Sequence, residues 1–226
     1  VVEVGEEATH FKPGEIVGVG VMVDSCRECE YCLAGEEQYC NNPGMVGTYN
    51  GIGRDGQPTQ GGYSGAIVVD ENYVLNIPES IPLDKAAPLL CAGITSYSPL
   101  RTWKVGPGSK VAVAGLGGLG HMGVKLAAAM GAEVTVLSRS ESKRADAEKL
   151  GAHAFLNTED KAAMKAKRGY FDMVLNTIPV RHDVVPYLHL LRVDGVQVLV
   201  GLIGPMPEIH TGVLLGRKVL TGSGIG

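Results

Sequence analysis

The sequence of 226 residues is poor in aromatic side chains, which make up 5% of it, so Val, Leu, Ile and Ala must supply most of its core. It contains no apolar run near the roughly 18 residues that a membrane helix needs, and no signal-peptide-like stretch at its start. We therefore expect no membrane partner. General disorder is also excluded, because 45% of the residues are hydrophobic and only 19% are charged.

Glycine, by contrast, is abundant: 32 of the 226 residues are glycine, roughly twice the share of about 7% found in an average protein. The glycines follow no three-residue period, which excludes a collagen-like chain. Thirteen lie before residue 66, among expected turns, and five lie between Gly115 and Gly123. The second group is the one that indicates chemistry.

Charge is shared unevenly along the chain. Up to Ala92 there are 14 acidic and 4 basic residues, and after it 10 acidic and 16 basic. This shift predicts two domains, residues 1–92 and 93–226, and a basic second half that favours an anionic ligand. Nucleic acid is not the expected partner, because the basic residues are scattered and the overall pI is about 5.9.

Four of the five cysteines form a Cys-x2-Cys-x2-Cys-x7-Cys cluster, namely Cys26, Cys29, Cys32 and Cys40. Four thiolates around one tetrahedral ion are typical of a structural zinc site. An iron–sulfur cluster and disulfides are the alternatives, although the fourth spacing differs from the bacterial ferredoxin run. Unpaired thiols indicate a reducing compartment, so we expect a cytoplasmic protein. The fifth cysteine, Cys91, has apolar neighbours and alone predicts a buried small side chain.

A dinucleotide-binding fingerprint begins after the apolar strand expected at 110–114. The residues Gly115, Leu116, Gly117, Gly118, Leu119 and Gly120 form Gly-x-Gly-x-x-Gly, followed by a helical pattern and a second strand at 133–137. In this context the glycines allow a tight turn and a close approach of the pyrophosphate to the helix N-terminus. Such a turn in a sheet without a ligand is the alternative.

The end of the second strand predicts which cofactor binds. An acidic residue there would hold the ribose hydroxyls of NAD, but the chain instead carries Ser138, Arg139, Ser140 and Lys143. Hydroxyls and cations suit the 2′-phosphate of NADP through charge-assisted hydrogen bonds. We therefore expect NADP rather than NAD, and we expect Arg144 to face solvent.

Further strands are expected at 154–156, 171–176, 195–200 and 218–221, with helices near 160–168 and 181–191. Six strands with helical crossovers predict an α/β fold with a doubly wound parallel sheet. Ligands bind at the carboxyl ends of such strands. The positions expected to line the nicotinamide half are Thr177, Ile178, Gly201, Leu202 and Ser223.

The cysteine cluster, the segment 88–97 around Cys91, and the glycine fingerprint followed by His121 together resemble the zinc-containing medium-chain alcohol dehydrogenases. The chain is particularly similar to their NADP-dependent, cinnamyl alcohol dehydrogenase-like branch. The resemblance implies part of a GroES-like β-barrel catalytic domain, which carries a structural zinc lobe. This partial domain is expected to be joined to a Rossmann domain. The resemblance also implies a homodimer formed through the nucleotide-binding domain.

For individual residues, the resemblance implies that Cys91 is a ligand of a catalytic zinc and that Thr95 contacts the cofactor. The family's other catalytic-zinc ligands, a Cys and the His-Glu of a Gly-His-Glu motif, are not in this sequence. None of the six histidines stands in a matching motif, so we expect none to bind metal. The chain also begins without Met, and we expect it to be a fragment that lacks both termini.

The expected function of the parent protein is therefore zinc-dependent interconversion of primary alcohols and aldehydes with NADP(H). The fragment alone is expected to bind one zinc tightly and to have low activity. A non-catalytic NADPH-binding module, or relic of a dehydrogenase, is the alternative from a different class. A quinone reductase of the same superfamily and a zinc-dependent interaction module are further alternatives, of which the first usually lacks the zinc cysteines.

Overall fold

The computed structural model describes residues 1–225, and its contacts divide the chain into two compact units, Val1–Ile94 and Thr95–Gly224. The division falls inside the helix α3 (Ala92–Thr102), two residues beyond the boundary predicted from charge. The two units are described separately below.

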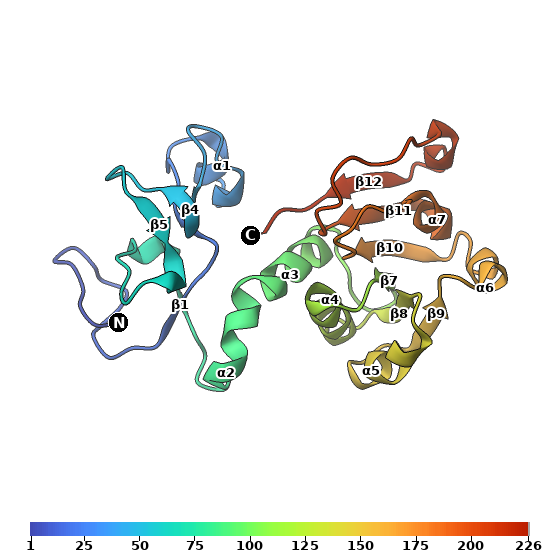
Figure 1. The fold of residues 1–226 in the computed structure, drawn as a ribbon, viewed down its shortest axis with the longest axis horizontal. Helices are drawn as coiled ribbons and strands as arrows, with labels where there is room; N and C mark the ends of the chain where they lie inside the picture. The colour runs from blue at the N-terminus through green and yellow to red at the C-terminus, as the bar shows by residue number, and fades with distance from the viewer. Residues whose placement is uncertain (226) are drawn as a thin grey trace. The chain divides into compact units, whose positions relative to one another are not determined.

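The second unit is built on a sheet of six parallel strands in the order β12-β11-β10-β7-β8-β9 (Figure 1). Its central strand β7 is buried along four of five positions, as its continuous apolar run predicts. The order reverses between β7 and β10, so their carboxyl ends form the topological switch point. The strands are β7 (Lys110–Ala114), β8 (Glu133–Ser138), β9 (Ala154–Asn157), β10 (Phe171–Asn176), β11 (Leu191–Leu199) and β12 (Val219–Gly222).

Helices cover both faces of this sheet. One core combines Val111 and Val113 of β7 with apolar residues of α3, α4 and α5, and the other combines Ala112 and Ala114 with residues of α6 and α7. Alternate residues of one strand thus enter opposite cores, as the two-residue period of a strand requires. This confirms the doubly wound fold. The helices are α4 (Gly118–Ala129), α5 (Arg144–Lys149), α6 (Lys161–Ala166) and α7 (Val185–Leu190).

The first unit consists of short antiparallel strand pairs, β1 with β6, β2 with β3, and β4 with β5. A lobe that contains the four clustered cysteines follows β2. The elements are β1 (Val17–Val19), β2 (Met22–Asp24), α1 (Glu30–Leu33), β3 (Val46–Gly47), β4 (Tyr49–Ile52), β5 (Pro58–Gln60), β6 (Val74–Asn76) and α2 (Leu83–Ala86).

Two elements begin four residues away from the predicted position, and the other boundaries differ by at most two residues. The helix expected from residue 181 begins only at Val185, because Asp183 accepts the backbone N–H of Val185 and Pro186 occupies the first turn. His182 therefore lies in the loop before α7 and does not share a helix with His189. The strand expected from 195 begins at Leu191, which pairs with Phe171 ahead of an irregularity in the ladder.

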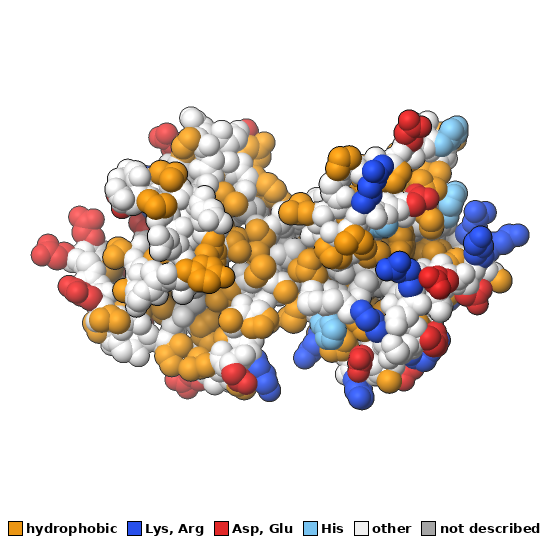
Figure 2. Space-filling model, in the orientation of Figure 1, with side chains coloured by type: hydrophobic (Ala, Val, Ile, Leu, Met, Phe, Trp, Pro, Cys, Tyr) orange, Lys and Arg blue, Asp and Glu red, His pale blue; other side chains and the backbone are white. Residues whose placement is uncertain are grey.

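The uneven charge of the sequence is visible on the surface. Figure 2 shows many Lys and Arg side chains on the visible face of the second unit, whereas Asp and Glu predominate among the charges of the first. Among the described residues, no helix has both the length and the apolar character needed to cross a lipid bilayer.

Candidate functional site

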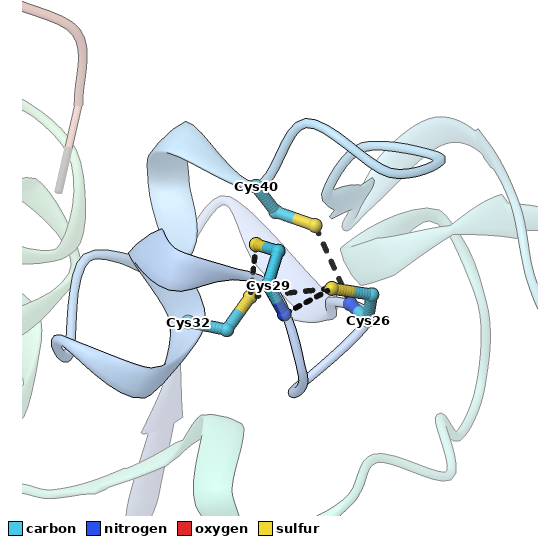
Figure 3. A group of neighbouring side chains, drawn as sticks. All are labelled: Cys26, Cys29, Cys32 and Cys40. Atoms are coloured by element: carbon cyan, nitrogen blue, oxygen red, sulfur yellow. Dashed lines mark hydrogen bonds between the residues drawn. The ribbon is translucent and has the colours of Figure 1, made fainter.

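The four clustered cysteines point toward a common centre (Figure 3). Their Sγ atoms all lie within 4.8 Å of one another, and the Sγ of Cys32 lies 3.5 Å from that of Cys29 and 3.8 Å from that of Cys26. Tetrahedral zinc with Zn–S bonds of roughly 2.3 Å requires sulfur atoms about 3.8 Å apart. All five cysteines are free thiols. The donor set and its spacing thus fit one zinc ion, with little room for a larger cluster.

The lobe around this centre has almost no other core. Of the described residues 26–40, only Cys32 and Cys40 are buried. The backbone N–H of Cys29 donates to Cys26 Sγ at 3.2 Å, and that of Cys26 donates to Cys40 Sγ at 3.4 Å. A hydrogen bond from the backbone N–H of Cys32 is the largest influence that lowers the pKa of Cys29, to about 6. The folded lobe therefore favours a thiolate, the form that binds metal, at Cys29, whereas desolvation and hydrogen bonds with the Cys29 and Cys40 sulfurs raise the pKa of Cys26 to about 11.

Hydrogen bonds attach the lobe to the rest of its unit. The buried hydroxyl of Ser25 accepts from Cys32 Sγ at 3.2 Å and from the Tyr73 hydroxyl at 2.7 Å. Arg27 donates to Asp24 at 2.9 Å and to Asp70 at 2.8 Å. The sulfur of Cys32 and the side chain of Arg27 are thus tied to residues near the end of β2 and in the segment before β6.

The glycine fingerprint forms the turn between β7 and α4. Gly115 adopts a φ of +91°, which favours glycine, and its N–H donates to Leu137 O at 3.0 Å. The hydroxyl of Thr177, just after β10, donates to Ala114 O at 2.9 Å. A Cβ on Gly120 would overlap the carbonyl oxygen of Gly115, whereas one on Gly117 would meet no atom within 4 Å. The three glycines therefore serve different purposes.

The residues predicted to hold a 2′-phosphate lie beside this turn, at the end of β8. Lys143 extends its Nζ to Leu116 O at 3.1 Å, which joins the two segments. Arg139 is exposed and takes part in no ion pair among residues 1–225. Arg144 instead pairs with Glu141 at 2.6 Å. Arg139 and Lys143 are therefore the two cations that the end of β8 and the turn after it offer to an anion.

A cavity of about 900 Å³ runs along the carboxyl ends of β7, β8, β9 and β10. It brings together eleven predicted cofactor residues, namely Gly115, Leu116, Gly117, Gly118, Leu119, Ser138, Arg139, Ser140, Lys143, Thr177 and Ile178. Its position at the switch point, beside the N-terminus of α4, suits a dinucleotide with its pyrophosphate at the helix end.

The other predicted cofactor residues do not line this cavity. Thr95 is buried in α3, Gly120 is buried beneath the turn, and Gly201 packs against the backbone of Ile178. Leu202 is 94% exposed, and the N–H of Ser223 donates to Leu199 O. Their roles in cofactor binding remain predictions.

Cys91 was expected from its neighbours alone to be buried, and this was wrong: its side chain is exposed at the end of a helical turn. Its apolar neighbours in the preceding turn are not buried either, and α3 buries other positions, among them Thr95 and Leu100. In the described part of the chain, the four clustered cysteines form the one group of three or more His, Cys, Asp or Glu side chains placed to share a metal ion. The role of Cys91 as a metal ligand therefore remains a prediction.

Sequence reasoning missed eight residues of the cavity wall: Thr158, Glu159, Pro179, Val180, Arg181, His182, Tyr187 and Leu137. The first two follow β9 and the next four continue the loop after β10. The rule that selected Thr177 and Ile178, that ligands meet the carboxyl ends of parallel strands, would have found them if it had been applied further along each loop.

Two protein families match the chain. The alcohol dehydrogenase GroES-like domain family matches residues 1–79, and the zinc-binding dehydrogenase family matches residues 118–226. The NADP-dependent alcohol dehydrogenase C 1 of Mycolicibacterium smegmatis is 61% identical over the whole chain, and a probable formaldehyde dehydrogenase of Bacillus subtilis is 50% identical. The chain spans 65% of the length of each of these relatives.

Solved structures agree with these matches. A cinnamyl alcohol dehydrogenase from Sorghum bicolor superposes with a TM-score of 0.94 at 46% identity, and one from Helicobacter pylori, complexed with NADP(H), with a TM-score of 0.90 at 44% identity. Both comparisons cover 100% of this chain and 65% of the other. Together with the cysteine cluster and the glycine turn, these findings confirm the resemblance seen in the sequence, and the chain belongs to the zinc-containing alcohol dehydrogenase family.

Proposed function

We propose that the protein is an oxidoreductase that interconverts primary alcohols and aldehydes with NADP(H). The observation that carries this proposal is the cavity at the switch point, where a glycine turn faces Arg139 and Lys143 across the end of β8. The relatives support it, because one is named an NADP-dependent alcohol dehydrogenase and another was solved with NADP(H).

In this proposal, the chain's own residues bind and orient the cofactor. Backbone N–H groups at the start of α4 and the positive end of its dipole hold the pyrophosphate. Arg139 and Lys143, with the hydroxyls of Ser138 and Ser140, hold the 2′-phosphate. NADP(H), when bound, supplies or accepts the hydride of the reaction.

The proposal includes two zinc ions, one structural and one catalytic. The four clustered cysteines hold a structural ion, which leaves no open position for substrate. A catalytic zinc, for which Cys91 supplies one thiolate, would act as a Lewis acid on the alcohol or aldehyde oxygen. Among residues 1–225, Cys91 belongs to no group of three or more side chains placed to share a metal ion, so the proposal needs further ligands for this zinc.

A second candidate is a non-catalytic NADPH-binding module, which needs only the cavity at the switch point. Such a protein binds the cofactor through the same cavity but oxidises no alcohol when the full reading frame is expressed. A steady-state assay with primary alcohols and NADP separates the two. Activity that disappears on removal of a second, weakly held zinc supports the enzyme.

The proposal also includes an oligomeric state and a cellular location. Strand β12 lies at the edge of its sheet, and its outer side pairs with no strand of the described chain. We therefore propose a homodimer formed through this edge. The free thiols support a reducing, cytoplasmic location. Size-exclusion chromatography with light scattering tests the first of these, and fractionation of the source cell tests the second.

We expect the protein to bind NADPH more tightly than NADH, and the variant Arg139→Ala to lose most of this preference. Removing a charge-assisted hydrogen bond costs about 1.5–3 kcal/mol, so the NADPH dissociation constant should rise roughly tenfold to hundredfold. The NADH constant should stay unchanged, because NADH has no 2′-phosphate. Fluorescence titration of both cofactors measures the four values.

The matched control is Arg144→Ala, which removes a cation that pairs with Glu141 and does not line the cavity. It should leave both constants unchanged. Tighter binding of NADH than of NADPH by the unaltered protein would contradict the assignment of the 2′-phosphate site. Equal losses of NADPH affinity in Arg139→Ala and Arg144→Ala would also contradict it.

A further inference from the structure

The loop Thr177–His182, here called the β10 loop, contributes six consecutive residues to the cavity wall. No other described segment contributes a longer run. It begins at the switch point, where the hydroxyl of Thr177 donates to Ala114 O at 2.9 Å and so anchors the loop beside the glycine turn. The conformation of this loop therefore sets the shape of one wall of the proposed cofactor site.

The far end of the loop returns to the strand from which it left. Nε2 of His182 lies 2.9 Å from Nδ2 of Asn176, the last residue of β10, and Nδ1 of His182 lies 2.8 Å from Val180 O. Asn176 is only 1% exposed, and its Oδ1 accepts the backbone N–H of Ile178 at 3.2 Å. The loop is thus closed by a pair of side chains, Asn176 and His182.

The hydrogen bonds assign the protons of this pair. Because Asn176 Oδ1 accepts from Ile178, its Nδ2 is the atom that faces His182 and must donate. Nε2 of His182 is then the acceptor, and its Nδ1–H donates to Val180 O. This set is satisfied only by a neutral imidazole. A proton on Nε2 would place two donors face to face, and rotating the amide would then set its NH2 group against the N–H of Ile178.

We propose that His182 is a positioning residue for the nicotinamide cofactor, one that holds the β10 loop in its binding conformation only while its imidazole is neutral. The inference rests on the proposed cofactor site. A loop that is already ordered loses less conformational entropy when the ligand binds, so closing it raises affinity. Protonation of His182 opens the Asn176–His182 pair and lowers affinity.

The titratable and charged groups near His182 come from its own loop, from α7 and from the wall of the shared cavity. Its ring packs edge-on against that of Tyr187 in α7, with centroids 5.7 Å apart. Arg181 and Asp183 are its chain neighbours, and Asp183 is engaged with the N–H of Val185. Arg139 and Glu159 line the same cavity from the ends of β8 and β9. Histidine side chains in general change charge between pH 5 and 8, which sets the pH range over which the effect is sought.

The experiment compares NADPH binding by the protein and three variants, measured by fluorescence titration from pH 5.5 to 8. His182→Gln keeps a hydrogen-bond acceptor near the position of Nε2, and this acceptor does not change its protonation with pH. His182→Asn keeps only a polar group near the position of Nδ1. His182→Ala keeps neither group. At pH 8 we expect His182→Gln to bind like the unaltered protein. The Ala and Asn variants both lose the hydrogen bond from Asn176, so they should bind roughly threefold to tenfold more weakly.

The pH profile separates positioning from a merely structural role. The 2′-phosphate of NADPH also titrates in this range, so the informative quantity is the affinity of the unaltered protein relative to that of His182→Gln at each pH. This ratio should fall as the pH drops from 8 to 5.5. His210→Gln, which alters an exposed histidine outside the cavity wall, should leave the profile unchanged.

Two results would overturn the inference: a constant ratio across the pH range, or an NADPH affinity of His182→Ala within twofold of the unaltered protein at pH 8. Thermal unfolding of each variant shows whether the fold is retained, and His182→Gln supplies the comparison even where His182→Ala unfolds. Failure of the unaltered protein to bind either NADPH or NADH is a different result, which rejects the proposed cofactor site itself.

Discussion

The variant Cys32→Ser is expected to lose its tightly bound zinc, about one ion per chain, and with it the folded cysteine lobe. Serine oxygen is a poor ligand for zinc beside three thiolates, and Cys32 is one of only two buried side chains among the described residues 26–40. The lobe has one four-residue helix, α1, and a further helical turn, so it has little else to hold it together. Metal analysis after dialysis against a chelator measures the loss.

Limited proteolysis gives the second measurement, because an unfolded lobe exposes cleavable backbone. Tyr31, Leu33 and Tyr39 are already surface side chains there, so new cleavage should appear within 26–40 and before any in the sheet of the second unit. The matched control is Cys91→Ser, which alters the cysteine outside the cluster. It should keep the resistant lobe. A Cys32→Ser protein that holds the tight ion and resists the protease would show that the four cysteines are not a structural zinc site.

Sequence patterns predicted the second unit well because its strands, turns and helices are determined by residues that are neighbours in the chain. Strand β7 is a continuous apolar run, the glycine turn follows it directly, and buried parallel strands separated by helices leave few alternative topologies. The partners in the cysteine cluster were also predictable, because neighbours three residues apart along a tight turn direct their thiols to one centre. These features depend on residues that lie close together in the chain.

The features that were missed depend on individual side-chain contacts that leave no periodic pattern in the sequence. The start of α7 is set by the hydrogen bond from Val185 to Asp183 and by Pro186, which moved His182 out of a helix and onto the cavity wall. Its partner Asn176 was predictable as the end of a strand, but the pairing across the loop was not. The strands of the first unit were even harder to predict. A strand such as β3, with two residues, is too short to show an alternating pattern of apolar and polar residues.

The glycine turn yields the other large effect, and it separates two roles that the motif alone assigns together. In Gly120→Ala, the new Cβ would overlap the carbonyl oxygen of Gly115 and lie 3.0 Å from its carbonyl carbon. Both are backbone atoms of the turn and cannot rotate away, so α4 must shift from β7. Overpacking of this kind costs about 3 kcal/mol or more, and we expect a clear fall in the melting temperature and in soluble yield.

Gly117→Ala is the matched variant and should fail differently. No atom lies within 4 Å of the added Cβ, and the φ of −102° is open to alanine. Stability should therefore change by no more than about 0.5 kcal/mol. The methyl group instead occupies the space through which the pyrophosphate reaches the backbone, so NADPH should bind roughly tenfold more weakly or worse. Thermal unfolding and NADPH titration of both variants test the pair. Equal stability losses would contradict the geometry of the turn, and unchanged affinity in Gly117→Ala would contradict a dinucleotide at this site.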